Sequence, residues 1–327
     1  MYSNTRLPSV KHQTFQALAR RTHPQHHAYP QILQKLSIED AGYHGEQYFD
    51  QVAAKLLSPH CSQLKNLLLS QFKETFQIDS IIITPNFILI CEIKNMVGNL
   101  HFDQRGGTLT RVLNNQKEYF TCPIFQVSRH SECISHLLKQ MKIKVPVYDL
   151  VIYTNQRVEF SVKDSETEIY EKIHRIEQFT YYFRKMLHAN AQHYLSSPQI
   201  KFIYQFLLKK DVFPFWRSYL NDIDIRHTDF IKGFICIECN RPAQSIRGGW
   251  RCDCCMKRRD GMLYQNIIDF FLLHGPSATA EEIRAFLNMS NKRQVIHYLK
   301  KLGFEPVQAG NHYVFHSPIH ESTLKNK

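Results

Sequence analysis

The sequence predicts a mixed α/β core followed by a small cysteine-rich module and a C-terminal helical segment. Two apolar runs meet at Pro85-Asn86, and a helical pattern and a further apolar strand follow them, which is typical of an α/β fold. Five of the nine cysteines fall between positions 236 and 255. With 327 residues, 43% of them hydrophobic, the chain can form more than one core.

Changes in composition divide the chain into six expected segments. They are a basic N-terminal extension (1–37), an α/β domain (38–190), a helical connector (191–232), a cysteine-rich module (233–260), a helical domain (261–318) and a basic tail (319–327). The extension is His-rich and lacks a clear periodicity, so we expect a mobile tail. Metal binding by His23, His26 and His27 is the alternative.

The net charge of +12 and the pI near 9.2 favour a polyanionic partner, with nucleic acid ahead of a membrane surface. No secretory signal opens the chain, and no apolar run approaches the ~20 residues of a membrane-spanning helix. The cysteines do not form a disulfide pattern; their clustering indicates metal binding in a reducing compartment. We therefore expect a cytoplasmic protein.

The first element of the α/β domain is a helix over 45–57, where Phe49, Val52, Ala53 and Leu56 recur on one face. A helix over 126–141 and a strand over 147–153 follow further along the chain. The most informative stretch lies between the two helices. It is a hairpin in which 81–83 approaches Pro85-Asn86 and 87–90 leaves it.

Three charged residues interrupt this apolar hairpin. If the turn is symmetric about Pro85-Asn86, Asp79 lies directly opposite Glu92, with Cβ atoms ~5 Å apart. Lys94 then points to the same face. Pro85 is incompatible with the tightest hairpin turns, so the register depends on a longer loop of even length.

Two facing carboxylates repel, and a divalent cation such as Mg²⁺ or Mn²⁺ is the simplest compensation. A nearby lysine suits activation of a water and stabilisation of phosphate charge. Asp79, Glu92 and Lys94 are therefore candidate catalytic residues, with the two carboxylates as metal ligands. The alternative is a structural Glu-Lys pair at a sheet edge.

The pattern of Asp79 followed by Glu92-Ile93-Lys94 resembles the metal site of the PD-(D/E)xK nuclease superfamily. Together with Gly45-Glu46-Gln47, Asn95, Gly98 and Pro123-Ile-Phe-Gln126, it resembles the nuclease-related domain family over roughly residues 38–155. The resemblance implies a restriction-endonuclease-like core, a mixed central sheet flanked by helices. It also implies that Glu46 faces the metal or its water shell and that Gln126 positions Lys94 or a phosphate. The leading Pro of the superfamily motif is replaced by Ile78.

The cysteine-rich module contains two CxxC motifs, Cys236-Ile-Glu-Cys239 and Cys252-Asp-Cys-Cys255. Four thiolates at this spacing suit one structural Zn²⁺, and the module resembles a zinc ribbon. Cys254 is the alternative to Cys255 as a ligand, and redox chemistry is the alternative to metal binding. Basic and aromatic residues around the motifs are candidates for nucleic-acid contacts: Arg247, Trp250, Arg251, Lys257 and Arg258. Packing of Trp250 over the zinc site is the alternative.

Two capped helices are expected after the module. Thr279 and Glu282 form a capping box before Ile283, Phe286 and Leu287, and Ser290 is expected to cap a helix whose inner face is Val295, Leu299 and Leu302. With the strand expected at 312–315, this arrangement resembles a winged helix-turn-helix. Lys292, Arg293 and His297 on the second helix would then face DNA.

The leading interpretation is a metal-dependent nuclease that hydrolyses DNA, with the C-terminal modules binding the nucleic acid. A non-catalytic DNA-binding regulator and an RNA-processing nuclease remain as alternatives.

Overall fold

The computed structural model describes residues 2–71, 74–103, 105–162, 168–246, 249–256, 261–310 and 312–319. The chain forms two compact units. The first contains 1–7 and 41–212, and the second contains 8–40 and 213–327. Helix α2 (Tyr29–Leu56) contributes its first turns to the second unit and the remainder to the first.

The first unit is built on a six-stranded mixed sheet with the order β1-β2-β3-β4-β8-β10. Its strands are β1 (Tyr2–Ser3), β2 (Ser62–Gln71), β3 (Glu74–Ile83), β4 (Ile88–Lys94), β8 (Val147–Tyr153) and β10 (Ile173–Arg175). The β2-β3 and β3-β4 pairs are antiparallel, and the β4-β8 and β8-β10 pairs are parallel. The mixed α/β class predicted from the sequence is confirmed.

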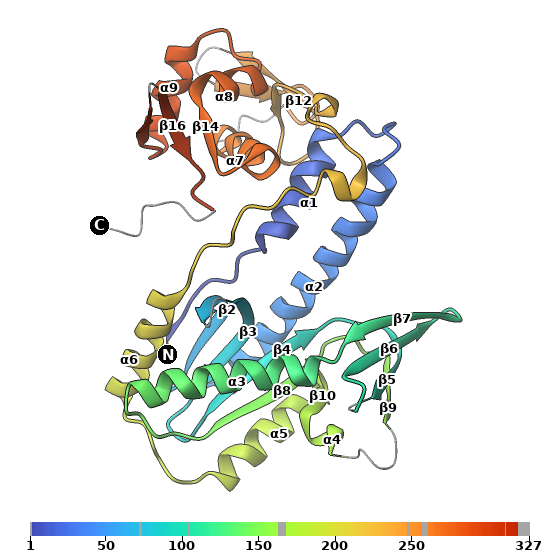
Figure 1. Cartoon of the computed structure of the whole chain (residues 1–327), viewed down its shortest axis with the longest axis vertical. Coiled ribbons are helices and arrows are strands. Elements are labelled where there is room, and N and C mark those ends of the chain that lie inside the picture. Colours follow the sequence, from blue (N-terminus) through green and yellow to red (C-terminus); the bar gives the residue numbers. More distant parts are fainter. Residues whose placement is uncertain are drawn as a thin grey trace. The chain divides into compact units, whose positions relative to one another are not determined.

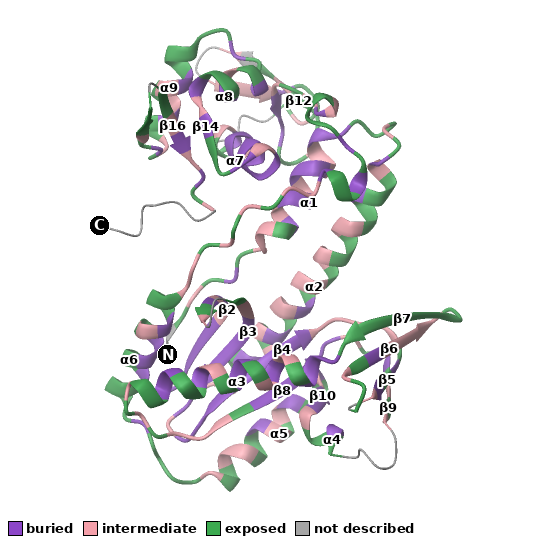
Figure 2. Ribbon diagram, in the orientation of Figure 1, coloured by how far each residue is buried: buried purple, intermediate pink, exposed green. Residues whose placement is uncertain are grey.

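Helices cover both faces of this sheet (Figure 1). They are the later turns of α2, α3 (Pro123–Gln140), α4 (Ile169–Lys172), α5 (Ile176–Ala189) and α6 (Ser197–Lys210). Alternation along β3 and β4 separates two cores. Ile81 and Ile90 pack with α3 and α6, whereas Ile82 and Leu89 pack with α2 and α5. Figure 2 shows the central strands as mostly buried and the outer side of α3 as exposed.

A second sheet of the first unit has the order β7-β6-β5-β9. Its strands are β5 (Gly98–Asp103), β6 (Thr108–Leu113), β7 (Gln116–Thr121) and β9 (Val158–Val162). Every residue of the edge strand β7 is exposed (Figure 2).

The second unit combines early and late parts of the chain. Helix α1 (Val10–Arg21) and the first turns of α2 pack with residues after 213. The later elements are the short helices η2 (Asn221–Ile223) and η3 (His227–Asp229), then β11 (Phe234–Ile235), β12 (Pro242–Ile246), β13 (Gly249–Cys252), α7 (Met262–His274), β14 (Ser277–Thr279), α8 (Ala280–Phe286), α9 (Lys292–Lys301), β15 (Pro306–Ala309) and β16 (His312–His316). Strands β11-β12-β13 and β14-β16-β15 form two small antiparallel sheets.

The structure differs from the sequence-based expectation at the N-terminus. Residues 10–21 form a helix rather than a mobile tail, because Phe15 and Leu18 are buried in the same core as Phe271 and Ile283. The two units therefore do not follow the expected boundaries at 37, 190 and 232. His26 lies 3.5 Å from Asp229, an ion-pair distance.

The C-terminal helices agree with the sequence more closely. Thr279 and Glu282 form the predicted capping box, and Val295 and Leu299 are buried as expected. The cap of α9 is Asn291 rather than Ser290, because the Asn291 side chain accepts the Arg293 N–H. Among the described residues, no helix has both the length and the apolar composition needed to cross a bilayer.

Candidate active site

The hairpin has the register that the sequence predicted. Residue pairs run from Ile83 opposite Ile88 to Ser80 opposite Cys91, and one further step places Asp79 opposite Glu92. At this step the Ile93 N–H donates to Asp79 Oδ2 at 2.8 Å. Glu92 and Lys94 lie at the end of β4 beside β8, and Lys94 Nζ is 2.6 Å from Glu92 Oε1.

A residue that the sequence analysis missed holds the other side of this site. Residues 65 and 67 of β2 pair with β3, but Asn66 between them has a left-handed φ of +51°. Arg6 from the N-terminal segment lies there, and its Nη2 donates to the Asp79 carbonyl oxygen at 2.9 Å. Its Nη1 donates to Asn66 Oδ1 at 2.5 Å and to Glu46 Oε2 at 2.7 Å.

Arg6 also forms a bidentate pair with Asp50, with Nε 2.7 Å from Oδ2 and Nη2 3.0 Å from Oδ1. The five N–H groups of its guanidinium therefore all have acceptors, in a fixed fork geometry that lysine cannot reproduce. Arg6 connects α2, β2 and β3, and it does so from a stretch that looks in the sequence like part of a basic tail.

Close packing of α2 brings Glu46 to the site. A Cβ on Gly45 would lie 2.5 Å from Thr154 Oγ1 and 2.7 Å from Asn95 Cβ. Only glycine allows the helix to approach the ends of β4 and β8 this closely. Glu46 follows directly, but its Oε2 is bonded to Arg6.

The three carboxylates influence one another electrostatically. Burial raises the pKa of Glu92 to about 8, Asp79 adds to this increase, and Lys94 opposes it. Burial and Asp79 raise the pKa of Glu46 to about 7 against the effect of Arg6. Burial also raises the pKa of Asp79, with Lys94, the Ile93 N–H and Arg6 opposing. The site thus favours any cation that enters it.

Lys94 is the counter-charge that reaches solvent. Burial alone would lower its pKa, but Glu92 and Asp79 outweigh burial and raise the pKa above its usual value. Its side chain is 30% exposed, whereas that of Glu92 is 3% exposed. Lys94 is therefore a protonated donor at neutral pH that a substrate could contact.

Gln126 is half-buried on the first turns of α3, and among the described residues its side chain has no hydrogen bond. The structure therefore does not connect it to Lys94. One turn later, His130 is buried with its Nδ1 3.9 Å from Glu92 Oε2. The sequence signal for His130 was its spacing of four residues from Gln126, which places both on neighbouring turns.

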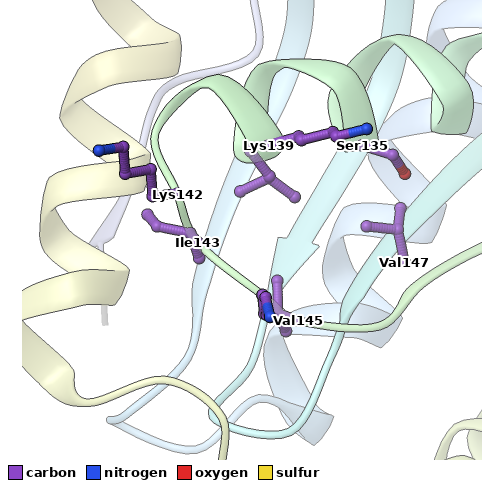
Figure 3. Close-up of a pocket in the computed structure, with 8 residues that line it drawn as sticks. Ser135, Lys139, Lys142, Ile143, Val145 and Val147 are labelled. Atoms are coloured by element: carbon purple, nitrogen blue, oxygen red, sulfur yellow. The ribbon is translucent and has the colours of Figure 1, made fainter.

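A hollow of the first unit lies away from these residues. It has a volume of about 530 Å³ at the C-terminal end of α3, and Leu138, Ile143, Val145 and Val147 line it together with three lysines (Figure 3). None of the predicted catalytic residues lines it, and it contains no carboxylate or imidazole. The hollow is therefore separate from the residues of the predicted catalytic site.

The cysteine-rich module brings four thiols together. The Sγ atoms of Cys236, Cys239, Cys252 and Cys255 all lie within 4.8 Å of one another, and Cys254 is exposed outside the cluster. Within the described part of the chain, no other group of three or more His, Cys, Asp or Glu side chains converges this closely. The cluster fits a structural zinc, as predicted, with Cys255 as the fourth ligand.

The predicted nucleic-acid residues have different surroundings. Lys292, Arg293 and His297 are exposed on α9. Trp250 stacks on Phe234 with ring centroids 4.0 Å apart, so the indole packs against the core. Arg251 is half-buried. Arg247, Lys257 and Arg258 lie outside the described residues.

The sequence of residues 41–154 matches the family model of the nuclease-related domain, abbreviated NERD. Comparisons with curated proteins and with solved structures gave no match. The match begins after Arg6 and includes Glu46, Asp79, Glu92, Lys94 and Gln126. Residues 41–154 of this chain are therefore a nuclease-related domain.

Proposed function

We propose that this protein is a divalent-metal-dependent nuclease that hydrolyses phosphodiester bonds, with DNA as the favoured substrate. The observation that carries the proposal is the buried Glu92 carboxylate, opposite Asp79 and 2.6 Å from the partly exposed Lys94. A carboxylate pair can hold a divalent ion that activates water for phosphodiester hydrolysis, and a neighbouring lysine can stabilise negative charge on the phosphate.

The residues present suit a hard divalent ion. Glu92 Oε2 is buried and has no hydrogen-bond partner in the described structure, and the neighbouring carboxylates raise its pKa. Asp79 and Glu92 would hold Mg²⁺ or Mn²⁺, with Glu46 near its water shell. The ion would polarise a phosphoryl oxygen and lower the pKa of a bound water.

The chain supplies the remaining groups. Lys94 is bonded to Glu92 and is protonated at neutral pH. As a cation it orients the attacking water and stabilises negative charge on the phosphate, rather than removing a proton in this conformation. Arg6 keeps Glu46 and the backbone of Asp79 in place.

The second unit would bind the nucleic acid. On α9, the basic residues are exposed while Val295 and Leu299 are buried, so one face is free for phosphates or base edges. Helices α7 to α9 with the sheet β14-β16-β15 support a winged-helix module, and an exposed basic helix suits the major groove of B-form DNA. The deep, narrow groove of A-form RNA admits it less well.

Cleavage of labelled single- and double-stranded DNA and RNA tests the proposal, with Mg²⁺, Mn²⁺ or chelator and with Lys94→Ala as the inactive control. We expect metal-dependent cleavage of DNA that chelator and the substitution abolish. Cleavage that survives both would place the activity elsewhere, and faster cleavage of RNA would correct the substrate.

One observation favours a second candidate, a DNA-binding regulator without catalysis. Lys94 and Arg6 already neutralise Glu92 and Glu46, which a purely structural site would also require. This candidate predicts salt-dependent DNA binding, no cleavage with either metal, and no effect of Glu92→Gln on metal affinity.

A further inference from the structure

Three buried polar atoms without partners belong to side chains on the face of the central sheet that α3 covers, the face of the candidate active site. They are Glu92 Oε2, His130 Nδ1 and the Tyr153 hydroxyl, and none has a hydrogen-bond partner in the described structure. Lys94 and Tyr153 are register partners on the parallel strands β4 and β8, so their side chains and that of Glu92 point to the same face. Burial raises the pKa of Tyr153, and Cys122 and Glu92 add to this increase electrostatically.

The position of the imidazole is well fixed. His130 comes from α3, and its ring stacks on Phe76 with centroids 5.2 Å apart and 20° between the planes. Burial lowers its pKa to about 4, with Arg129 and Lys94 contributing, so the ring is neutral at physiological pH. A neutral ring has one nitrogen that accepts and one that donates.

The distance between Glu92 Oε2 and His130 Nδ1 is 3.9 Å, too long for a direct hydrogen bond. A single water about 2.8 Å from each atom spans this distance, and buried waters are held by two to four polar partners. Without such a bridge, each unpaired buried group destabilises the fold, so three of them on one face of the sheet are unexpected.

We propose that His130 and Tyr153 are positioning residues for Glu92, and that they hold its Oε2 through one shared buried water. Oε1 then stays directed toward Lys94 and the candidate metal position. The part of this inference that concerns metal rests on the proposed function; the part that concerns the buried water does not.

The test uses the full-length, zinc-loaded protein and two measurements. Free Mn²⁺ is counted by electron paramagnetic resonance to obtain the affinity of the carboxylate site. The melting temperature is measured in chelator weak enough to leave zinc bound. His130→Phe keeps the stack on Phe76 but loses the nitrogen, whereas His130→Asn retains a polar atom near the position of Nδ1.

We expect His130→Phe and Tyr153→Phe to weaken Mn²⁺ binding by about 10- to 100-fold, as for other residues that orient metal ligands. His130→Asn should recover most of this loss. His136→Asn, on the exposed side of the same helix, and Tyr119→Phe, on the exposed strand β7, are matched controls that should bind Mn²⁺ like the wild type. A role in packing alone would lower the melting temperature and leave the affinity unchanged.

A metal-free double-mutant comparison separates this inference from the proposed function. If Glu92, His130 and the water form one unit, the melting-temperature shifts of Glu92→Gln and His130→Phe are non-additive in the double variant. Additive shifts, or unaltered Mn²⁺ affinity in His130→Phe, would overturn the inference. If Glu92→Ala binds Mn²⁺ like the wild type, the proposed function fails, and the non-additivity alone then supports or overturns the shared water.

Discussion

The thiol cluster of the second unit and the carboxylate site of the first are both suited to metal, but they are assembled in opposite ways. Four cysteines from a stretch of 20 residues, 236–255, converge within 4.8 Å of one another. The carboxylate site takes Arg6, Glu46, Asp79, Glu92 and His130 from five elements or segments, and protein cations hold its charges. A structural zinc site can supply folding energy that a small module would otherwise need from a hydrophobic core. The carboxylate site instead depends on a surrounding core that holds its side chains in place.

The largest effect should follow loss of the thiol cluster. Cys236→Ser or Cys239→Ser should unfold the cysteine-rich module, because binding of structural zinc is worth about 10–16 kcal/mol and is also its folding energy. Zinc content and limited proteolysis measure this. Cys254→Ser is the matched control and should keep one zinc per chain; protein purified without chelator but free of zinc would contradict the prediction.

Substitutions in the carboxylate site should lower the cleavage rate rather than the stability of the fold. Lys94→Ala and Glu92→Ala should each lower the cleavage rate by about 100-fold or more, because a preorganised charge at the phosphate is lost. Asp79→Asn should act like Glu92→Ala. Cleavage rate, DNA affinity and melting temperature are measured on the same preparations, with the exposed Lys139→Ala as control.

A purely structural Glu-Lys pair gives a different pattern: activity would fall only in proportion to the folded fraction. A Lys94→Ala protein that is folded and cuts DNA at the wild-type rate would show that the site is wrongly assigned.

Substitution of Arg6 tests whether the stability of the first unit depends on a residue outside the matched domain, residues 41–154. Arg6→Ala should destabilise this unit by about 3–5 kcal/mol, because Asp50 and Glu46 would lose their buried partner. Arg6→Lys should recover only part of this, since an ammonium cannot form the bidentate pair. Chemical denaturation measures the loss, and the exposed Arg157→Ala should be neutral.

The raised pKa values predict how metal-free stability changes with pH. Glu46 and Glu92 bind protons up to about pH 7 and 8 in the folded state, but the unfolded chain releases them near 4.5. The folded state therefore holds more protons between these values, so raising the pH from 5 to 8 should lower its stability. Mn²⁺ should reverse the loss at pH 8.

Denaturant midpoints at both pH values check this expectation. Glu92→Gln removes one of the carboxylates with a raised pKa and should show a smaller decrease. An equal decrease in the variant would mean that Glu92 is not a source of the pH dependence.

The smallest effect concerns α9. Lys292→Ala with Arg293→Ala should reduce the slope of log affinity against log salt by about two, because two fewer phosphate contacts release counterions. Binding of labelled DNA at several salt concentrations measures the slope. The exposed pair Lys142 and Lys144, on the hollow in Figure 3, provides a charge-matched control that should leave the slope unchanged.

The predictable parts of the molecule were those determined by neighbours in sequence. The register of Asp79 and Glu92 followed from a short turn, and the thiol cluster followed from two CxxC motifs. Arg6 and His130 were missed because their partners lie 40 and 38 positions away. Nothing in the sequence around Arg6 indicates such a distant contact, and the local signal for His130 is only its spacing of four residues from Gln126.

Helix α1 was missed for a related reason. Its mean hydropathy is low, and its buried arginine is stabilised by a distant carboxylate, Asp269, rather than by its own neighbours. Similarly, Ser290 and Asn291 are both good helix caps, and only the backbone at the start of α9 decides between them.

The pairing of α1 with α7 also determines the order in which the protein can fold during synthesis. Arg21 leaves the ribosome 248 residues before its partner Asp269. At a synthesis rate of roughly 5–20 residues per second, about 12 to 50 s pass before the residues of α7 that cover Phe15 and Leu18 are synthesised. A nascent chain of this protein therefore exposes the apolar face of α1, including Phe15 and Leu18, until α7 has been synthesised.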